Sequence, residues 1–132
     1  MLVVDASAAL EVLLRTPAAP TIEAQLFAGR ESLHAPDPLD LEVLRILRRV
    51  ELEGAIDAAR AAEARAALAD MRIVRHPSRP LLDRAWTLRH DITIADGLYV
   101  ALAQGLGADL LTTDLRFARA AATHAGVATR PL

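Results

Sequence analysis

The chain has 132 residues, of which 53% are hydrophobic and 24% charged, and this composition excludes intrinsic disorder and is typical of one soluble globular domain. The formal net charge of -2 does not indicate nucleic-acid binding by the protein as a whole, so any such binding must use a local patch. The absence of cysteine excludes a disulfide framework, a thiolate nucleophile and a Cys-based zinc site.

The N-terminal segment is expected to belong to the folded domain. Its apolar runs are interrupted by Asp5 and Glu11, and it has neither a basic leader region nor a cleavage site. We therefore expect neither a signal peptide nor a membrane span, and the lack of cysteine favours a cytoplasmic protein. All fifteen basic residues are arginine, whose forked guanidinium can bind phosphate through two hydrogen bonds.

The first elements are predicted to be a strand and two helices. Residues 2–5 form an apolar run typical of a buried strand, and Ser7 is a suitable N-cap for a helix that ends near residue 14. A second short helix is predicted over residues 21–28, where Gly29 ends it.

The middle of the chain is predicted to contain two strands and two helices. A strand over residues 32–35 precedes an Asp-Pro pair that is typical of a helix start, and this helix runs to about residue 53. Residues 57–71 form an Ala-rich amphipathic helix, and residues 72–76 form the next strand.

The last third is predicted to contain three helices and two strands. The helices cover residues 78–89, 93–106 and 115–124, and the strands cover residues 109–113 and 127–129, the last at a sheet edge. Gly107 is the expected C-cap of the second of these helices.

Strands that alternate with helices predict an α/β protein, with a three-layer α/β/α sandwich around a central, mostly parallel sheet of four to five strands. No internal repeat, low-complexity tract or linker divides the chain, so we expect one domain over residues 1–132. In open parallel sheets, ligands bind beyond the carboxyl ends of the strands. Residues that directly follow a strand are therefore the first candidates for a site.

Two aspartates follow predicted strands directly. Asp5 ends "LVVD" and Asp114 ends "LLTTD". Each could simply cap the helix that follows it, a role that Ser7 could fill equally well at the first helix. We favour a functional role for Asp5, and the pair is stronger evidence than either residue alone.

Glu42 lies in mid-helix within an apolar stripe that includes its i-3 and i+4 neighbours, Leu39 and Ile46. A carboxylate in such a stripe is unusual. The alternative is a residue at the edge of the stripe that pairs with Arg45 or Arg49, which is the commoner role of an isolated glutamate.

Asp96 has a specific structural alternative, because "TIAD" matches the capping box with Thr93 as the N-cap. The apolar neighbours Tyr99 and Val100 indicate instead that this first turn faces the interior. Gly97 costs up to about 1 kcal/mol relative to alanine in a helix, without an obvious packing benefit in the sequence.

Four carboxylates at one end of a sheet would repel one another and raise each other's pKa unless a cation compensates. Oxygen ligands of this kind suit Mg²⁺ or Mn²⁺ rather than zinc. The sequence therefore predicts a divalent-metal site if the four side chains converge.

The segments "LVVDASAAL", "APDPLDLEVLRILRR", "ITIADGLYVALAQGLGADLLTTD" and "LRFARA" occur in this order and together resemble the PIN-domain family. Within that family they are most similar to the small VapC-type ribonuclease toxins of bacterial toxin-antitoxin pairs. The resemblance spans nearly the whole chain. It implies a PIN-like fold and a metal-dependent endoribonuclease that hydrolyses RNA phosphodiester bonds.

The resemblance also implies the site residues, which are four acids: Asp5, Glu42, Asp96 and Asp114. Three of them, Asp5, Asp96 and Asp114, would hold one or two Mg²⁺ or Mn²⁺ ions. Glu42 would complete the shell or orient water, and no side-chain nucleophile is needed.

Three further residues are assigned supporting roles. The resemblance implies Ser7 and Thr112 as the hydroxyls that accompany the first and last acids. Arg116, which follows Asp114 closely, could contact substrate phosphate, although a solvated surface arginine is the commoner case. Gly97 stands where such proteins often have alanine, which is a mild departure from the pattern.

The resemblance further implies a homodimer and a small cognate antitoxin that blocks the acidic pocket. Two other hypotheses remain open. A phosphatase with Asp5 as nucleophile would need a second aspartate two residues later, where Ser7 stands. A catalytically silent PIN-like module would use its acids only as helix caps and would act through a protein or RNA partner.

Overall fold

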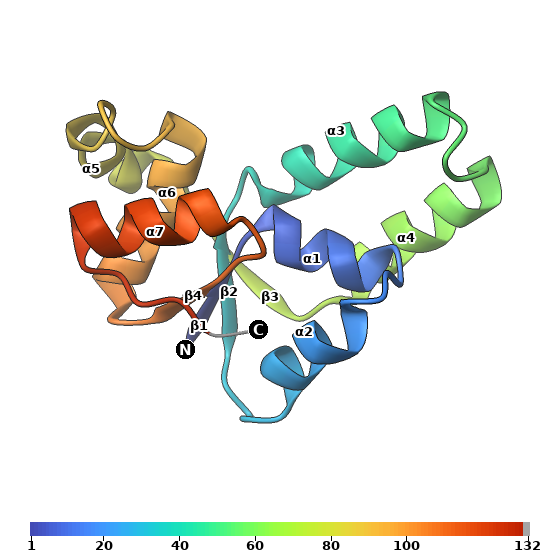
Figure 1. The fold of residues 1–132 in the computed structure, drawn as a ribbon, viewed down its shortest axis with the longest axis horizontal. Coiled ribbons are helices and arrows are strands. Elements are labelled where there is room, and N and C mark those ends of the chain that lie inside the picture. Colours follow the sequence, from blue (N-terminus) through green and yellow to red (C-terminus); the bar gives the residue numbers. More distant parts are fainter. Residues whose placement is uncertain (131–132) are drawn as a thin grey trace.

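The computed structural model describes residues 1–130, in which four strands form one parallel sheet (Figure 1). The strands are β1 (Leu2–Val4), β2 (Leu33–Pro36), β3 (Ile73–His76) and β4 (Asp109–Leu111), in the spatial order β3-β2-β1-β4. The predicted parallel sheet is confirmed. Residues 127–129 contribute a single bridge, between Leu110 and Thr129, rather than the expected edge strand.

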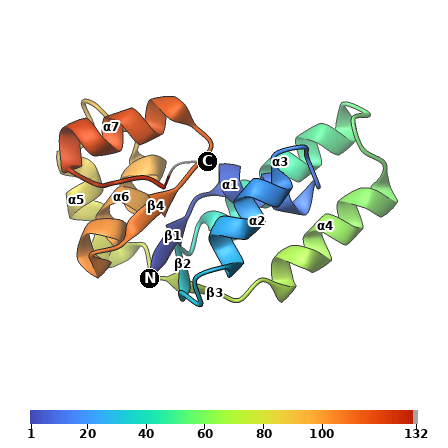
Figure 2. The ribbon, with the colours of Figure 1, turned by 60° about the horizontal axis from the view of Figure 1, so that its bottom comes forward.

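Helices cover both faces of the sheet, as Figures 1 and 2 show. One layer contains α1 (Ala6–Leu13), α2 (Ala19–Phe27), α3 (Leu39–Leu52) and α4 (Ala58–Asp70). The other contains the 3₁₀ turn η1 (Arg79–Leu81), α5 (Leu82–Thr87) and α6 (Ile94–Leu106), and α7 (Leu115–Ala125) packs beside α6. None of the helices in residues 1–130 is long and apolar enough to cross a membrane.

Four predicted helices differ from the structure, and one of them, α2, begins at Ala19 rather than at residue 21. Asp5, not Ser7, is the N-cap of α1, because its side chain accepts a hydrogen bond from the Ala8 amide. The helix predicted from Pro38 begins one residue later, so Glu42 lies in the first turn of α3 rather than in mid-helix. The helix predicted over residues 78–89 consists of η1 and the short helix α5.

Central strand β1 fixes the position of the carboxyl edge of the sheet. All three of its residues are completely buried, and Val4 pairs with Leu111 of β4. Since the strands are parallel, the residues that follow β1, β2 and β4 emerge at the same edge. The expectation drawn from strand order therefore holds for the backbone at Asp5 and Asp114.

Gly97 has a packing role that is not visible in the sequence. A Cβ atom at this position would lie 3.0 Å from the Cβ and 3.1 Å from the Cα of Ala85. The glycine thus allows α5 and α6 to approach closely, which offsets its low helix propensity. The structure thus reveals a packing benefit of Gly97 that was not obvious from the sequence.

We expect Gly97→Val to destabilise the protein by about 1–3 kcal/mol, because the added side chain overpacks the α5–α6 contact. Gly105→Val is the matched control in the same helix, since a Cβ there meets nothing within 4 Å. Urea denaturation monitored by circular dichroism measures both. Equal stabilities of the two variants would contradict this role of Gly97.

Candidate active site

Asp5 is held at the carboxyl edge by hydrogen bonds to both of its oxygens. The Ser7 hydroxyl donates to Oδ1 at 2.6 Å, and the Thr112 hydroxyl donates to Oδ2 at 2.6 Å. The Ala8 amide also donates to Oδ1, at 3.1 Å. Burial raises the pKa of Asp5, whose residue is only 6% exposed, while these hydrogen bonds oppose the rise.

The two hydroxyls also fix the segment that follows β4. The Thr113 amide donates to Ser7 Oγ at 3.0 Å, and the Asp114 amide donates to Thr112 Oγ1 at 3.0 Å. The hydroxyl oxygens of Ser7 and Thr112 lie 3.2 Å apart. Ser7 and Thr112 therefore connect the first acid to the last one, although they are 105 residues apart in the sequence.

Asp114 begins α7 as its N-cap. Its Oδ1 accepts hydrogen bonds from the amides of Arg116 at 3.0 Å and Phe117 at 3.1 Å. These are the hydrogen bonds of its side chain within residues 1–130, and both use the same oxygen. Asp114 thus caps the helix and is also exposed at the carboxyl edge of the sheet.

Asp96 lies in the first turn of α6, where Thr93 is the N-cap. The Asp96 amide donates to Thr93 Oγ1 at 3.2 Å, so the predicted helix start is confirmed. Burial and the charge of Asp5 raise the pKa of Asp96, the charge of Asp114 adds to the rise, and a hydrogen bond with Thr93 opposes it. Asp96 and Asp114 also line a common cleft of about 300 Å³, and Arg116 lines the same cleft.

Glu42 comes from the other helical layer and contacts α6. The Tyr99 hydroxyl donates to its Oε1 at 2.9 Å, and no ion pair with Arg45 or Arg49 occurs in the described structure. Burial raises the pKa of Glu42, the Tyr99 hydrogen bond opposes this, and the charges of Asp96 and Asp5 raise it further, while the more distant charge of Arg45 lowers it.

Tyr99 contacts a candidate site residue in a way that the sequence did not reveal. Its spacing on α6 predicts core packing, and it is indeed only 1% exposed. The hydroxyl nevertheless reaches Glu42, 57 residues away in the sequence. The available signal was chemical, because a buried tyrosine hydroxyl usually finds a hydrogen-bond partner.

The structure places each of the four predicted acids within electrostatic range of at least one other. Asp96 interacts with Asp5 and Asp114, and Glu42 interacts with Asp96 and Asp5. Within residues 1–130, no three acidic or histidine side chains are already arranged to hold a metal ion. The donor chemistry still fits Mg²⁺, which commonly binds one or two carboxylates and keeps several waters.

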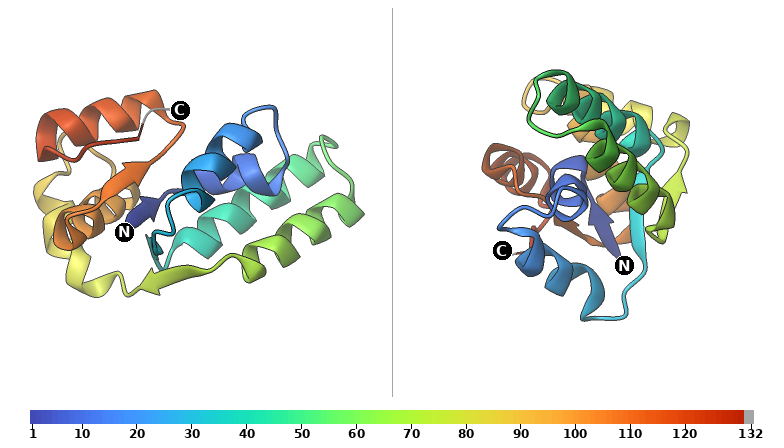
Figure 3. Two further views of the ribbon diagram at one scale, coloured as in Figure 1. Left: turned by 90° about the horizontal axis from the view of Figure 1, so that it is seen from below. Right: turned by 90° about the vertical axis from the view of Figure 1, so that its right-hand side faces the viewer.

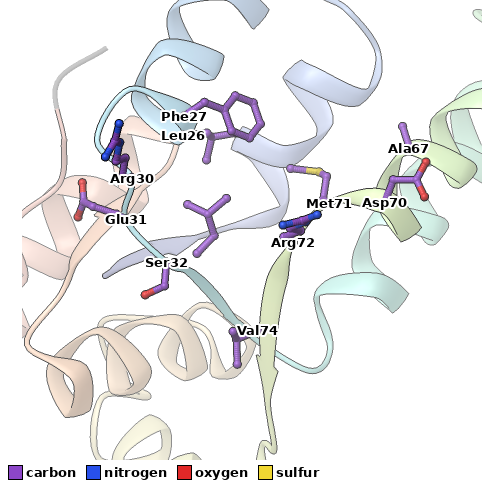
Figure 4. A pocket seen from close by; sticks show the side chains of 11 residues that line it. Leu26, Phe27, Arg30, Glu31, Ser32, Ala67, Asp70, Met71, Arg72 and Val74 are labelled. Atoms are coloured by element: carbon purple, nitrogen blue, oxygen red, sulfur yellow. The ribbon is translucent and has the colours of Figure 1, made fainter.

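A larger cavity lies at the opposite edge of the sheet (Figure 4). It has a volume of about 800 Å³, and its lining includes Phe27, Leu33, Met71 and Val74. These residues come from the C-terminal ends of α2 and α4 and from the strands that follow them. Because this is the amino edge of the sheet and its lining is largely apolar, we do not place the active site there.

Comparison with known proteins relates the chain to one family. The PIN domain family matches residues 2–123. Ribonuclease VapC12 of Mycobacterium tuberculosis is 39% identical over 119 residues, which cover 90% of this chain and 91% of that protein. Ribonuclease VapC3 of the same species is 41% identical over 119 residues, with 89% and 85% covered.

Solved structures agree with this relationship at the level of the fold. The crystal structure of Mycobacterium tuberculosis VapC20, a sarcin-ricin loop cleaving toxin, gives a TM-score of 0.69 at 19% identity and covers 91% of this chain and 95% of that chain. FitAcB from Neisseria gonorrhoeae gives a TM-score of 0.71 at 18% identity, with 99% and 97% covered. The predicted α/β fold class is thereby confirmed.

The raised pKa of Glu42 predicts a pH-dependent stability difference between the wild type and Glu42→Gln. Below the ordinary value of 4.5, the carboxyl is neutral in both folded and unfolded states, so the two proteins should have similar melting temperatures. As the pH rises through the raised pKa of the folded state, the wild type must ionise a disfavoured carboxyl and loses stability relative to the variant. Thermal denaturation in EDTA at about pH 4 and pH 7.5 measures this difference.

The exposed Glu23→Gln in α2 is the matched control, because it removes the same charge far from the acidic cluster. At the higher pH, Glu42→Gln should melt at a higher temperature than the wild type. This increase should be larger than any increase that Glu23→Gln shows. A difference that is independent of pH, or that has the opposite sign, would contradict the raised pKa of Glu42.

Proposed function

The chain belongs to the PIN-domain family, and we propose that it is an endoribonuclease toxin of the VapC type that hydrolyses RNA phosphodiester bonds with Mg²⁺ or Mn²⁺. The observation that supports this most strongly is the proximity of four carboxylates from separate parts of the chain. Thr112 is hydrogen-bonded to Asp5 and to the Asp114 amide, Asp96 and Asp114 line one cleft, and Glu42 is hydrogen-bonded to Tyr99 of the helix that carries Asp96. The site lies where open parallel sheets bind ligands. The two relatives of this chain from Mycobacterium tuberculosis are named ribonucleases, and the match covers most of their length.

We assign Asp5, Asp96 and Asp114 as the residues that hold the cation. When bound, the cation lowers the pKa of a water molecule and offsets charge on the phosphate. Asp5 is positioned by its hydroxyl donors, which favour the ionised carboxylate despite burial. Asp114 caps α7 through Oδ1 and can use its other oxygen for the cation.

Glu42 is assigned to complete the cation shell or to orient the attacking water. The Tyr99 hydroxyl positions it by donating to Oε1. Burial and the charge of Glu42 raise the pKa of Tyr99, so the phenol stays protonated and remains a donor. Arg116 lies in the cleft with Asp96 and Asp114, which suits a contact with substrate phosphate.

Position 7 bears on the phosphatase alternative. An aspartate there would be the second acid of that mechanism, whereas Ser7 donates a hydrogen bond to Asp5. Asp5 already accepts hydrogen bonds from Ser7, Ala8 and Thr112, which favours a fixed ligand over an attacking nucleophile. These contacts support the nuclease over the phosphatase.

We also propose a cytoplasmic toxin that forms a homodimer and is neutralised by a cognate antitoxin. The relatives are VapC ribonucleases, and one structural neighbour is described as a toxin. Large apolar side chains are exposed on α5 and in α3, including Trp86 at 60% and Leu41 at 62%. Exposed apolar side chains of this size are typical of surfaces that bind other proteins.

Purified protein should cleave single-stranded RNA with Mg²⁺ or Mn²⁺ and should lose the activity in EDTA. Asp5→Asn and Asp96→Asn should each lower the cleavage rate about 100-fold or more, because each removes a proposed cation ligand. Gel assays of RNA cleavage measure the rates. Asp109→Asn is the control, since Asp109 lies at the amino end of β4 and pairs with Arg130.

Circular dichroism should show that these variants keep the fold. Undiminished cleavage in EDTA would exclude the metal-dependent mechanism. RNA binding without cleavage at any metal concentration would support the catalytically silent module instead.

The partner proposal has its own test. Co-expression with the small reading frame next to this gene should yield a stable complex on gel filtration and relieve growth arrest. Light scattering of the isolated chain should give twice its mass of 14.2 kDa. A monomer would contradict the homodimer, and the absence of both complex and relief would contradict neutralisation by that neighbour.

A further inference from the structure

Helix α3 carries three exposed arginines beside the acidic cluster: Arg45, Arg48 and Arg49. Together with Glu42 and Ile46 they line a groove of about 460 Å³, which we call the arginine groove. Elsewhere the guanidinium groups of Arg60, Arg75 and Arg130 form ion pairs with carboxylates. The guanidinium groups of the three groove arginines form neither hydrogen bonds nor ion pairs with any of residues 1–130. They are therefore available to an external anion.

The arginine groove starts at the proposed active site and leads away from it. Arg45 and Arg49 follow Glu42 at i+3 and i+7, so they lie on the same side of the helix. With a rise of 1.5 Å per residue, Arg45 lies about 4.5 Å and Arg49 about 10 Å from Glu42 along the axis. In Figure 1, α3 begins above the sheet edge and extends outward beside α4, as Figure 3 also shows.

The rest of α3 holds this face in place. Leu39, Val43 and Leu47 are buried on the side that packs against the core. The helix cannot rotate to hide its arginines without exposing these side chains. The arginine groove is thus a fixed feature of the fold.

We propose that the arginine groove binds the phosphate backbone of single-stranded RNA on one side of the cleaved bond. The inference rests on the proposed nuclease function, because continuity with Glu42 is what associates the groove with RNA. Arginine forks match the geometry of phosphate oxygens. With a formal net charge of -2, the protein needs such a local patch to attract a polyanion.

The composition of the arginine groove also indicates how the strand is recognised. Among residues 1–130, its lining contains no aromatic side chain on which a base could stack, and its one apolar residue is Ile46. Contacts to phosphate carry no sequence information. The groove therefore adds affinity and sets the path of the strand, but it does not select the bases.

Binding of a fluorescent, uncleavable 2′-O-methyl RNA strand tests this proposal. Anisotropy is measured in EDTA over a series of salt concentrations for the wild type and for the triple variant R45Q/R48Q/R49Q. We expect the variant to bind about tenfold more weakly or worse at low salt. Its slope of log K against log salt should be shallower by about 2, since each phosphate contact to a single strand contributes about 0.7.

The matched control is R72Q/R79Q/R119Q, which removes the same charge from exposed arginines outside the groove. It should keep the wild-type slope, and thermal denaturation should show that both triple variants are folded. Equal slopes for the two variants, or no binding by the wild type, would overturn the proposal. Tighter wild-type binding to polyglutamate than to RNA would also overturn it and would assign the groove to an acidic protein.

Cleavage of the unmodified strand with Mg²⁺ is measured in parallel on the wild type. Cleavage together with an unchanged slope in R45Q/R48Q/R49Q would overturn the groove alone. An absence of cleavage in the wild type would count against the proposed nuclease function, whatever the groove variants show.

Discussion

The carboxylate of Asp5 accepts hydrogen bonds from Ser7 and Thr112, and the geometry of the whole carboxyl edge depends on this arrangement. A buried charge is costly unless its oxygens are hydrogen-bonded. Here the donors come from the start of α1 and from the turn after β4, so satisfying Asp5 requires that both segments be correctly placed. The same contacts that allow the charge to be buried therefore align Asp114 and the N-terminus of α7 with β1.

The remaining acids add repulsion that the fold does not fully relieve. Burial raises the pKa of Asp5, Asp96 and Glu42, and neighbouring carboxylates raise it further at Asp96 and Glu42. Near neutral pH, these groups therefore lower the stability of the folded state. Binding sites commonly lower the stability of a protein, because the charges that repel one another in the folded state are the ones that bind the ligand.

Much of the fold could be predicted because its signals are local. Thr93 and Gly107 bound α6 as expected, since capping depends on residues within one turn. The positions of Asp5 and Asp114 followed from strand order, but their convergence with Glu42 and Asp96 was inferred from family resemblance rather than from periodicity. Contacts between distant segments were missed. The Tyr99–Glu42 hydrogen bond and the close approach of Gly97 to Ala85 depend on how α6 packs against α3 and α5.

Helix capping and a role in the site, which the sequence presented as alternatives for Asp5 and Asp114, are compatible. Both residues cap helices, and Thr93 caps the helix that carries Asp96. The N-terminus of a helix carries a partial positive charge of about 0.5, so α1, α3, α6 and α7 each direct some positive potential towards the acid at their own N-terminus. This helps to keep the carboxylates ionised, but four such ends supply only about half the positive charge needed to balance the four acids. The remainder is the charge that the proposed divalent cation would balance, so helix capping and the proposed cation role complement each other.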